Sequence, residues 1–180
     1  MATLFVDKLD PQSGTALEIG TSGDTVTVPA GATFNVAGTA GTNIGKVLQV
    51  VTATDSTART TTSTSFVTAS NTLTVDITPS ATTSKVLILA SSMIYASAQY
   101  RWLETTIFRG GSNILSSNGA SGIYGGADNG GSISINYLDS PSSTSSLTYD
   151  VRLRISNSDT TAYINYASST GSIIALEIGA

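Results

Sequence analysis

Apolar and polar side chains alternate every second residue along much of this chain. The clearest instance covers residues 146–155, whose apolar positions are Leu147, Tyr149, Val151, Leu153 and Ile155. The residues between them are Thr148, Asp150, Arg152 and Arg154. Successive side chains of a strand point to opposite faces, so this pattern predicts a β-strand with one buried face.

Similar strand-length segments recur, with no helical period between them. They cover residues 46–53, 71–78, 85–95, 100–108, 132–138, 162–167 and 172–178. The polar stretches 54–63 and 110–132 are predicted as loops, and the apolar run Val86 to Leu89 predicts a strand buried on both faces. About eight strands at this spacing predict an all-β protein, with an antiparallel jelly-roll β-sandwich over residues 46–180.

Residues 1–45 follow a different pattern, in which apolar residues stand three and five positions after a glycine. These positions are Leu17, Ile19, Val26, Val28, Phe34 and Val36. Each repeat predicts a short strand and a glycine turn, with too few apolar side chains to offset the entropy of ordering it. The segment must therefore dock on the next domain or wind with copies of itself. We expect a stem in which three chains place these six residues on a common axis; a flexible linker is the alternative.

The chain has few side chains suited to catalysis, because it has no histidine and no cysteine. Serine–histidine and cysteine–histidine catalysis and zinc binding are therefore excluded. Glu104 and Asp76 are the carboxylates a glycan-active enzyme would use, but strand faces usually carry solvated carboxylates. Asp128 and Asn129 are typical of a turn rather than a calcium loop. We expect a protein that is not an enzyme, with no cofactor and no metal.

The low charge of the chain limits the classes of molecule that it can bind. Only 11% of the residues are charged and the net charge is −4. With no basic stripe for the phosphate backbone, we expect no nucleic acid partner. The first residues lack the pattern of a signal peptide, and no apolar run approaches the length of a membrane span, so we expect no membrane insertion.

Aromatic side chains are the remaining candidates for recognition. Trp102 and Tyr124 are the two that we expect to contact a ligand, with Tyr124 in a glycine-rich loop beside Asp128 and Asn129. A place in the core or at a subunit interface is the alternative for Trp102.

Several segments together resemble virion fibre and decoration proteins of tailed bacteriophages, marine (cyanophage-like) ones especially. The resemblance rests on residues 23–34, 46–51, 62–67, 73–79, 84–88, 137–141 and 176–178. It implies a homotrimer with a β-rich anchor before a jelly-roll knob, exposed on the virion after synthesis in the host cytoplasm. The chain is short for a long tail fibre, which favours a head fibre, capsid decoration or short tail appendage.

The leading hypothesis is therefore a non-enzymatic phage structural protein. Residues 1–45 would attach it to capsid or tail proteins. Residues 46–180 would form a knob that meets the host surface, where bacterial glycans are candidate partners. One alternative is a capsid decoration (cement) protein that clamps capsid subunits. The other is a carbohydrate-binding module or glycan-active enzyme.

Overall fold

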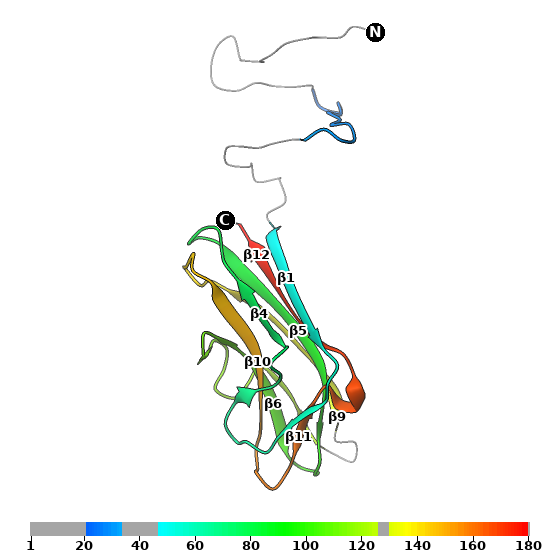
Figure 1. Ribbon diagram of the computed structural model, residues 1–180, viewed down its shortest axis with the longest axis vertical. Coiled ribbons are helices and arrows are strands. Elements are labelled where there is room, and N and C mark those ends of the chain that lie inside the picture. The colour runs from blue at the N-terminus through cyan, green and yellow to red at the C-terminus, as the bar shows by residue number, and fades with distance from the viewer. Residues whose placement is uncertain (1–20, 34–46, 126–129, 180) are drawn as a thin grey trace. The chain divides into compact units, whose positions relative to one another are not determined.

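The computed structural model describes residues 21–33, 47–125 and 130–179. The chain divides into two units, Met1–Ile44 and Gly45–Ala180. Figure 1 shows the second unit as a sandwich of long strands.

In the first unit, residues 21–33 form two turns. The Asp24 N–H donates to the Thr21 carbonyl and the Ala32 N–H to the Pro29 carbonyl, each at 3.0 Å. Gly23 and Gly31 take φ values of +97° and +86° in these turns, which explains the glycine period.

The axis residues of the predicted stem are only partly covered by the structure. Val26 and Val28 are 62% and 43% exposed, and the described residues of this unit contain no strand. The other four, Leu17, Ile19, Phe34 and Val36, lie outside the described residues, as do Asp128 and Asn129. The stem remains a prediction.

The second unit is built from strands. Their bounds are β1 Val47–Asp55, β2 Arg59–Thr61, β3 Val67–Thr68, β4 Thr74–Ile77, β5 Lys85–Ala96, β6 Trp102–Arg109, β7 Ser112–Asn113, β8 Ser121–Tyr124, β9 Gly130–Asp139, β10 Leu147–Ile155, β11 Ala162–Ile164 and β12 Gly171–Ile178. A single 3-10 turn, η1, covers Tyr166–Ser168.

Eight of these strands pair in nested order. The first pairs with the last (β1 with β12), then β4 with β10, β5 with β9 and β6 with β8, all antiparallel. This nesting is what results when one long antiparallel ribbon rolls up, and it defines a jelly roll. The predicted all-β jelly-roll sandwich is confirmed.

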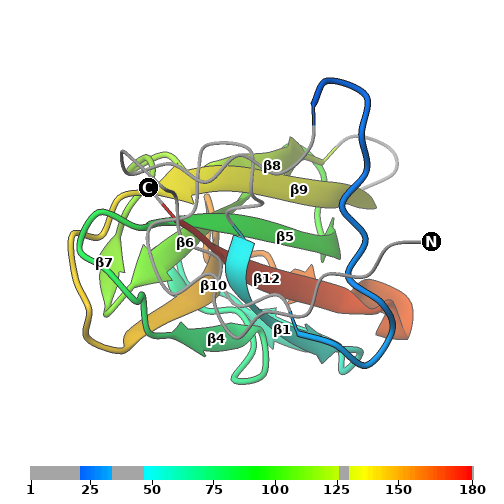
Figure 2. The same cartoon turned by 90° about the horizontal axis from the view of Figure 1, so that it is seen from above.

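The rolled ribbon makes two sheets. Sheet A has the order β1-β12-β5-β9, and β11 and β2 continue it beside the second half of β5. Sheet B has β10 and β6 at its centre, with β3 and β4 on one side and β7 and β8 on the other. Figure 2 shows β9, β5, β12 and β1 following one another across sheet A.

The core lies between the sheets and follows the alternation in the sequence. In β10, the side chains of Tyr149, Val151, Leu153 and Ile155 are at most 2% exposed. They meet Val86, Ile88 and Ile94 of β5, which are fully buried. The predicted inward face of residues 146–155 is therefore confirmed.

Three short strands lie in segments predicted as loops. β2 lies within residues 54–63, and β7 and β8 lie within 110–132. They are only two to four residues long, too short for a clear alternation, and it is pairing with β11 and β6 that holds them extended. The prediction that Tyr124 lies in a loop is thus wrong, because Tyr124 ends β8.

The prediction that residues 86–89 are buried on both faces is also wrong. Val86 and Ile88 enter the core, whereas Leu87 and Leu89 are only partly buried and point the other way. Sheet A packs on sheet B with one face only, so its second apolar set is left on the outer face.

Candidate functional surfaces

The outer face of sheet A carries a row of aliphatic side chains across all four strands. Strand register aligns Leu138 of β9 with Leu87 of β5, Leu87 with Leu176 of β12, and Leu176 with Val50 of β1. Leu138 and Val50, at the two ends of the row, are 47% and 58% exposed. The row is continuous because each of the four strands presents an aliphatic residue at the same level.

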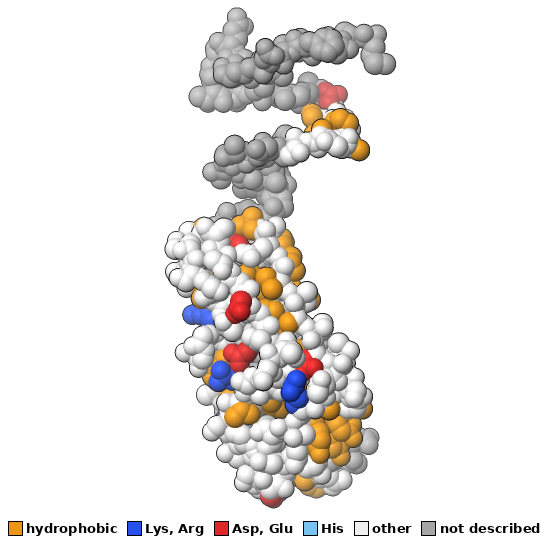
Figure 3. Space-filling view, viewed as in Figure 1, with side chains coloured by type: hydrophobic (Ala, Val, Ile, Leu, Met, Phe, Trp, Pro, Cys, Tyr) orange, Lys and Arg blue, Asp and Glu red, His pale blue; other side chains and the backbone are white. Residues whose placement is uncertain are grey.

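Further apolar residues widen this row into a patch. Leu89 pairs with Ile174 on one side of it, and Ile178 pairs with Val47 on the other. Val47 and Leu48 are more than half exposed. Figure 3 shows hydrophobic side chains following β1 down one side of the unit. We call these nine residues the apolar face: Val47, Leu48, Val50, Leu87, Leu89, Leu138, Ile174, Leu176 and Ile178.

Charge is nearly absent from this side of the sheet. Among the described strand residues that point outward from sheet A, Lys85 at the first position of β5 is the one charged side chain. A contiguous, uncharged apolar surface of this kind is typical of an interaction site.

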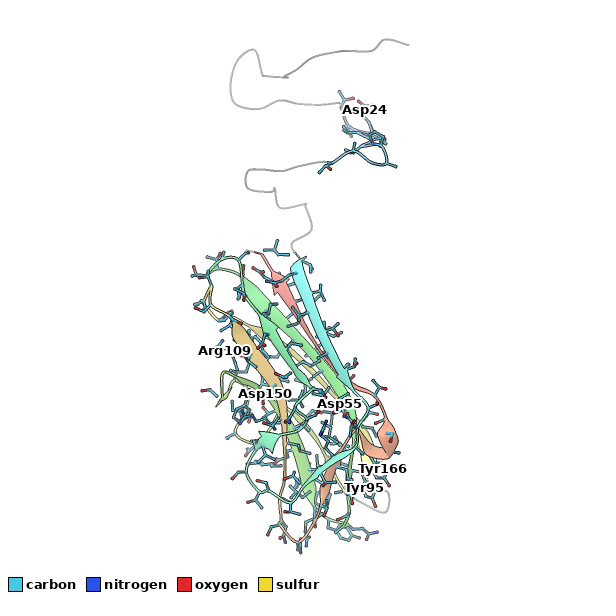
Figure 4. The ribbon with its side chains drawn as sticks, viewed as in Figure 1. Asp24, Asp55, Tyr95, Arg109, Asp150 and Tyr166 are labelled. Carbon is cyan, nitrogen blue, oxygen red and sulfur yellow. The ribbon has the colours of Figure 1, made fainter. Side chains whose placement is uncertain are left out.

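A tyrosine cluster occupies the other end of the same sheet. Tyr95 of β5 stacks on Tyr166 with ring centroids 4.3 Å apart, and Tyr163 of β11 meets both rings edge-on at 5.7 Å (Figure 4). Tyr163 and Tyr166 are three residues apart and would point to opposite faces of one continuous strand. They lie together because β11 ends at Ile164 and Asn165 takes a left-handed conformation, with φ of 53°.

The carboxylates of sheet A point inward and are held by hydroxyl and amide groups. Glu177 of β12 is 1% exposed and accepts bonds from the Ser80 N–H and hydroxyl and from the Gln49 amide, at 2.6–2.7 Å. Burial on its own raises the pKa of Glu177, but these hydrogen bonds outweigh it and lower the pKa to about 2. Glu177 is therefore ionised inside the rim of the sandwich.

Asp55, at the end of β1, shows the same arrangement. It accepts from the Ser70 hydroxyl, from the Thr57 N–H at 2.9 Å and from Arg59 Nε at 3.1 Å. Burial opposes ionisation, yet these donors hold the pKa of Asp55 well below its usual range.

Asp139 joins the two sheets through a buried triad. The Tyr149 hydroxyl donates to Asp139 Oδ2 at 2.7 Å, and Arg109 Nη1 donates to the same oxygen at 2.5 Å. Burial and the adjacent carboxylate raise the pKa of Tyr149. The triad is a structural clamp between β6, β9 and β10, with its phenol protonated.

The outer face of sheet B carries its charges in ion pairs. Arg154 of β10 pairs with Glu104 of β6 at 2.6 Å, and Arg152 pairs with Asp150 of the same strand at 2.7 Å. The two guanidinium groups also lie over aromatic rings, Arg154 over Phe66 and Arg152 over Phe108, at 4.5 and 4.0 Å. This face resembles an ordinary solvated surface, in contrast to that of sheet A.

The carboxylates that sequence reasoning singled out for glycan cleavage are both engaged on this face. Glu104 binds Arg154, and Asp76 of β4 accepts a hydrogen bond from the Thr148 hydroxyl at 2.5 Å. They lie on strands separated by β10. Within the described ranges no three His, Cys, Asp or Glu side chains gather as a metal site, and no helix is long and apolar enough to span a membrane.

Trp102 and Tyr124, predicted separately, come together at one edge of sheet B. They are register partners of β6 and β8, their ring centroids are 4.9 Å apart, and each is about half exposed, at 52% and 51%. Tyr100, 66% exposed, lies 6.3 Å from Tyr124. We call these three residues the aromatic platform. Tyr95, five residues before Tyr100, lies instead in the tyrosine cluster.

A small cavity adjoins the aromatic platform. It has a volume of about 210 Å³ and is lined by Trp102, Glu104, Asn118, Gly119, Ala120, Ser121 and Gly122. The Ala120 N–H donates to the Thr105 carbonyl at 2.8 Å, and the Thr105 hydroxyl donates to the Ser121 carbonyl at 2.9 Å. The wall opposite Trp102 is therefore tied to β6.

The apolar face was missed by sequence reasoning, although a signal for it existed. In β5 and β12 both sets of alternate positions are apolar, as in Val86–Leu89 and Ile173–Leu176. That pattern indicates a strand with apolar side chains on both faces, but it does not show which face packs against the core.

Sequence comparison matches this chain to no protein family and to no curated protein. Among solved structures, it is similar to the VP2 subviral particle of infectious bursal disease virus, with 17% identity over 73% of this chain and a TM-score of 0.41. T=1 particles derived from the same virus give 14% identity, 73% coverage and a TM-score of 0.42. The chain spans 37% and 36% of the lengths of those two chains. Function is therefore argued from the chain's own surfaces.

Proposed function

We propose that this protein is a non-enzymatic structural protein of a bacteriophage virion. In this proposal it assembles as a homotrimer, and its jelly-roll unit forms a knob displayed on the particle for attachment to the host. The observation that carries the proposal is the apolar face, whose occupant is a second copy of the same chain.

The size of sheet A supports a copy of the chain as the occupant. β5 has 12 residues, about 40 Å of strand, and four strands spaced about 4.8 Å apart cover about 19 Å. The whole outer surface of these four strands, of which the apolar face is one end, therefore measures at most roughly 750 Å², close to the ~800 Å² per partner of a standard stable interface.

The contrast between the two sheets supports the same occupant. The outer face of sheet B carries partly buried ion pairs, Arg154 with Glu104 and Arg152 with Asp150, whereas the outward residues of sheet A carry only Lys85 within the described strands. Three copies that turn sheet A inward would bury the apolar faces, with Lys85 as the one outward charge that the described strands of each copy bring. Closed threefold packing also removes the exposed edges of β1 and β9.

A virion role fits this design because assembly needs repeated, uncharged contacts and no reaction chemistry. Jelly rolls serve in capsid proteins and in lectins alike, so the fold itself does not choose the function. The engagement of Glu104 by Arg154 and of Asp76 by Thr148 favours a structural role for both carboxylates.

The first test is the mass of the intact assembly. Native mass spectrometry of the full chain is expected to give three times the 18.3 kDa chain mass. Leu87→Lys with Leu176→Lys places two charges at the centre of the apolar face and is expected to yield folded monomers. The matched control, Thr74→Lys with Thr148→Lys on sheet B, is expected to remain trimeric.

A monomeric wild-type chain, or a trimeric Leu87→Lys/Leu176→Lys variant, would show that the apolar face does not hold copies together. The virion role is checked separately by protein mass spectrometry of purified phage particles, in which the chain is expected at a copy number divisible by three. Removal that leaves assembled capsids fragile would favour the cement alternative, in which capsid subunits cover the face.

A further inference from the structure

We propose that the aromatic platform and the adjoining cavity bind a neutral hexose-based glycan. The inference deepens the attachment part of the proposed function, and it names the site and ligand class that attachment would use. It is carried by the three exposed rings, by the cavity beside them and by the local charge balance.

The first step is the exposure of the rings. Tyr100, Trp102 and Tyr124 are each more than half exposed and lie side by side. Elsewhere in the described second unit, aromatic side chains are at least partly buried, as in Tyr149 of the core and the rings of the tyrosine cluster. Large apolar surface kept in water at one edge indicates a ligand that covers it.

The second step is rigidity, since a fixed platform loses little entropy on binding. The Tyr100 N–H donates to the Gly125 carbonyl at 2.6 Å and the Gly125 N–H donates to the Arg101 carbonyl at 2.9 Å. The Trp102 N–H donates to the Ser156 hydroxyl at 3.0 Å. The backbone that carries the rings is therefore held from both neighbouring segments.

The third step is the chemistry of the cavity. Its floor is formed by small residues from Gly119 to Gly122, and its rim carries the Glu104 carboxylate and the exposed Asn118 amide. Glu104 Oε2 accepts from Arg154, so the described residues leave Oε1 to accept from a ligand hydroxyl. A pyranose ring matches this arrangement, with C–H groups for the rings and hydroxyls for the carboxylate and amide.

The fourth step is the charge around the platform, which argues against anionic ligands. Glu104 is paired with Arg154, and Arg101 with Asp159 at 3.1 Å. The described side chains around the platform therefore have no surplus positive charge for phosphate, sulfate or nucleic acid. At about 210 Å³, the cavity is smaller than the ~300–1,000 Å³ usual for drug-sized ligands, and it suits one sugar ring of a longer chain.

Trp102 is the only tryptophan in the chain, so its fluorescence reports on this site alone. The full-length protein is titrated with four neutral hexasaccharides, made of glucose, mannose, galactose and N-acetylglucosamine. At least one is expected to give a saturable change in Trp102 emission. Tyr124→Ala keeps the reporter and is expected to weaken that binding at least tenfold, and Glu104→Gln severalfold.

The matched control is Tyr163→Ala in the tyrosine cluster, which is expected to leave binding unchanged. Absence of a saturable change with all four sugars overturns the inference, as does equal weakening by Tyr163→Ala. Heparin or a DNA duplex that binds in place of the sugars also overturns it. Native mass spectrometry of the same samples separates the two proposals: a trimer that ignores sugars refutes only this inference, and a monomer that binds them refutes only the assembly.

Discussion

Hydroxyl groups donate several of the hydrogen bonds that keep buried carboxylates ionised in this protein. Glu177 and Asp55 are buried carboxylates, and their donors are chiefly serine, threonine and glutamine groups with one arginine at Asp55. A carboxylate that gains several hydrogen bonds in the folded state has a lowered pKa, and this preference for the ionised form stabilises the fold. A chain rich in serine and threonine can therefore bury negative charge with few bases.

Glu177 makes this coupling testable through acid stability. Its pKa is about 2 in the folded protein against an ordinary value of 4.5. Its contribution is therefore fully present above pH 4.5 and is lost as pH falls from there towards 2. We expect the free energy of unfolding to fall by on the order of 2–3 kcal/mol over this range, as measured by urea denaturation at fixed protein concentration.

Glu177→Gln should lower the free energy of unfolding at neutral pH and make its fall with decreasing pH shallower. Asp55 would then account for the pH dependence that remains. Asp76→Asn, on the outer face of β4, serves as the control and should keep the wild-type slope. Identical slopes for wild type and Glu177→Gln would contradict the assignment.

At the scale of elements, the short strand β8 shows how backbone pairing overrides local propensity. Its four residues include Gly122, and the sequence around it is typical of a loop. A Cβ atom added at Gly122 would collide with the Leu103 carbonyl oxygen of β6. The glycine thus lets β8 approach β6 closely enough to pair, and pairing puts Tyr124 beside Trp102.

Gly122→Ala should therefore push β8 away from β6 and loosen the aromatic platform, while the paired strands of the core remain. We expect a loss of about 1–3 kcal/mol in unfolding free energy and a red shift of Trp102 emission. The control is Gly130→Ala, where an added Cβ would lie 3.4 Å from the Tyr95 ring, an ordinary contact. An unshifted emission spectrum for Gly122→Ala would mean that the close approach does not position Trp102.

At the scale of the whole molecule, the jelly roll closes on itself within residues 47–178. Its outermost pair joins β1 to β12, so the fold requires both ends of this span, and every strand that the structure describes lies in the second unit. The apolar face also lies entirely within it. The second unit therefore contains both the core and the surface proposed to hold copies together.

Removal of residues 1–45 should leave a folded and still trimeric knob. We expect an unchanged far-UV circular dichroism spectrum, a Tm within a few degrees of wild type, and a trimer mass by native mass spectrometry. A folded monomer would show that trimer formation depends on residues 1–45, in which the sequence predicts a stem. An unfolded product would show that the sandwich depends on residues before β1.

The sequence alone determined the strands that cross the core. In β10 one face is apolar and the other polar, so burial has a single solution, and Tyr149, Val151 and Leu153 enter the core as predicted. Trp102 and Tyr124 were also identifiable as candidates, because large aromatic residues beside glycine and polar residues lack an obvious place in the core.

Only the tertiary structure decided which apolar side chains remain on the surface and which distant residues meet. Leu87 has the same local pattern as Val86, and its exposure follows from sheet A having just one packed face. Likewise, 22 positions separate Trp102 from Tyr124, and they become neighbours because β8 pairs with β6 in this register. Alternation fixes the direction of a side chain relative to its own strand, whereas pairing between strands fixes its neighbours, and pairing is a property of the whole fold.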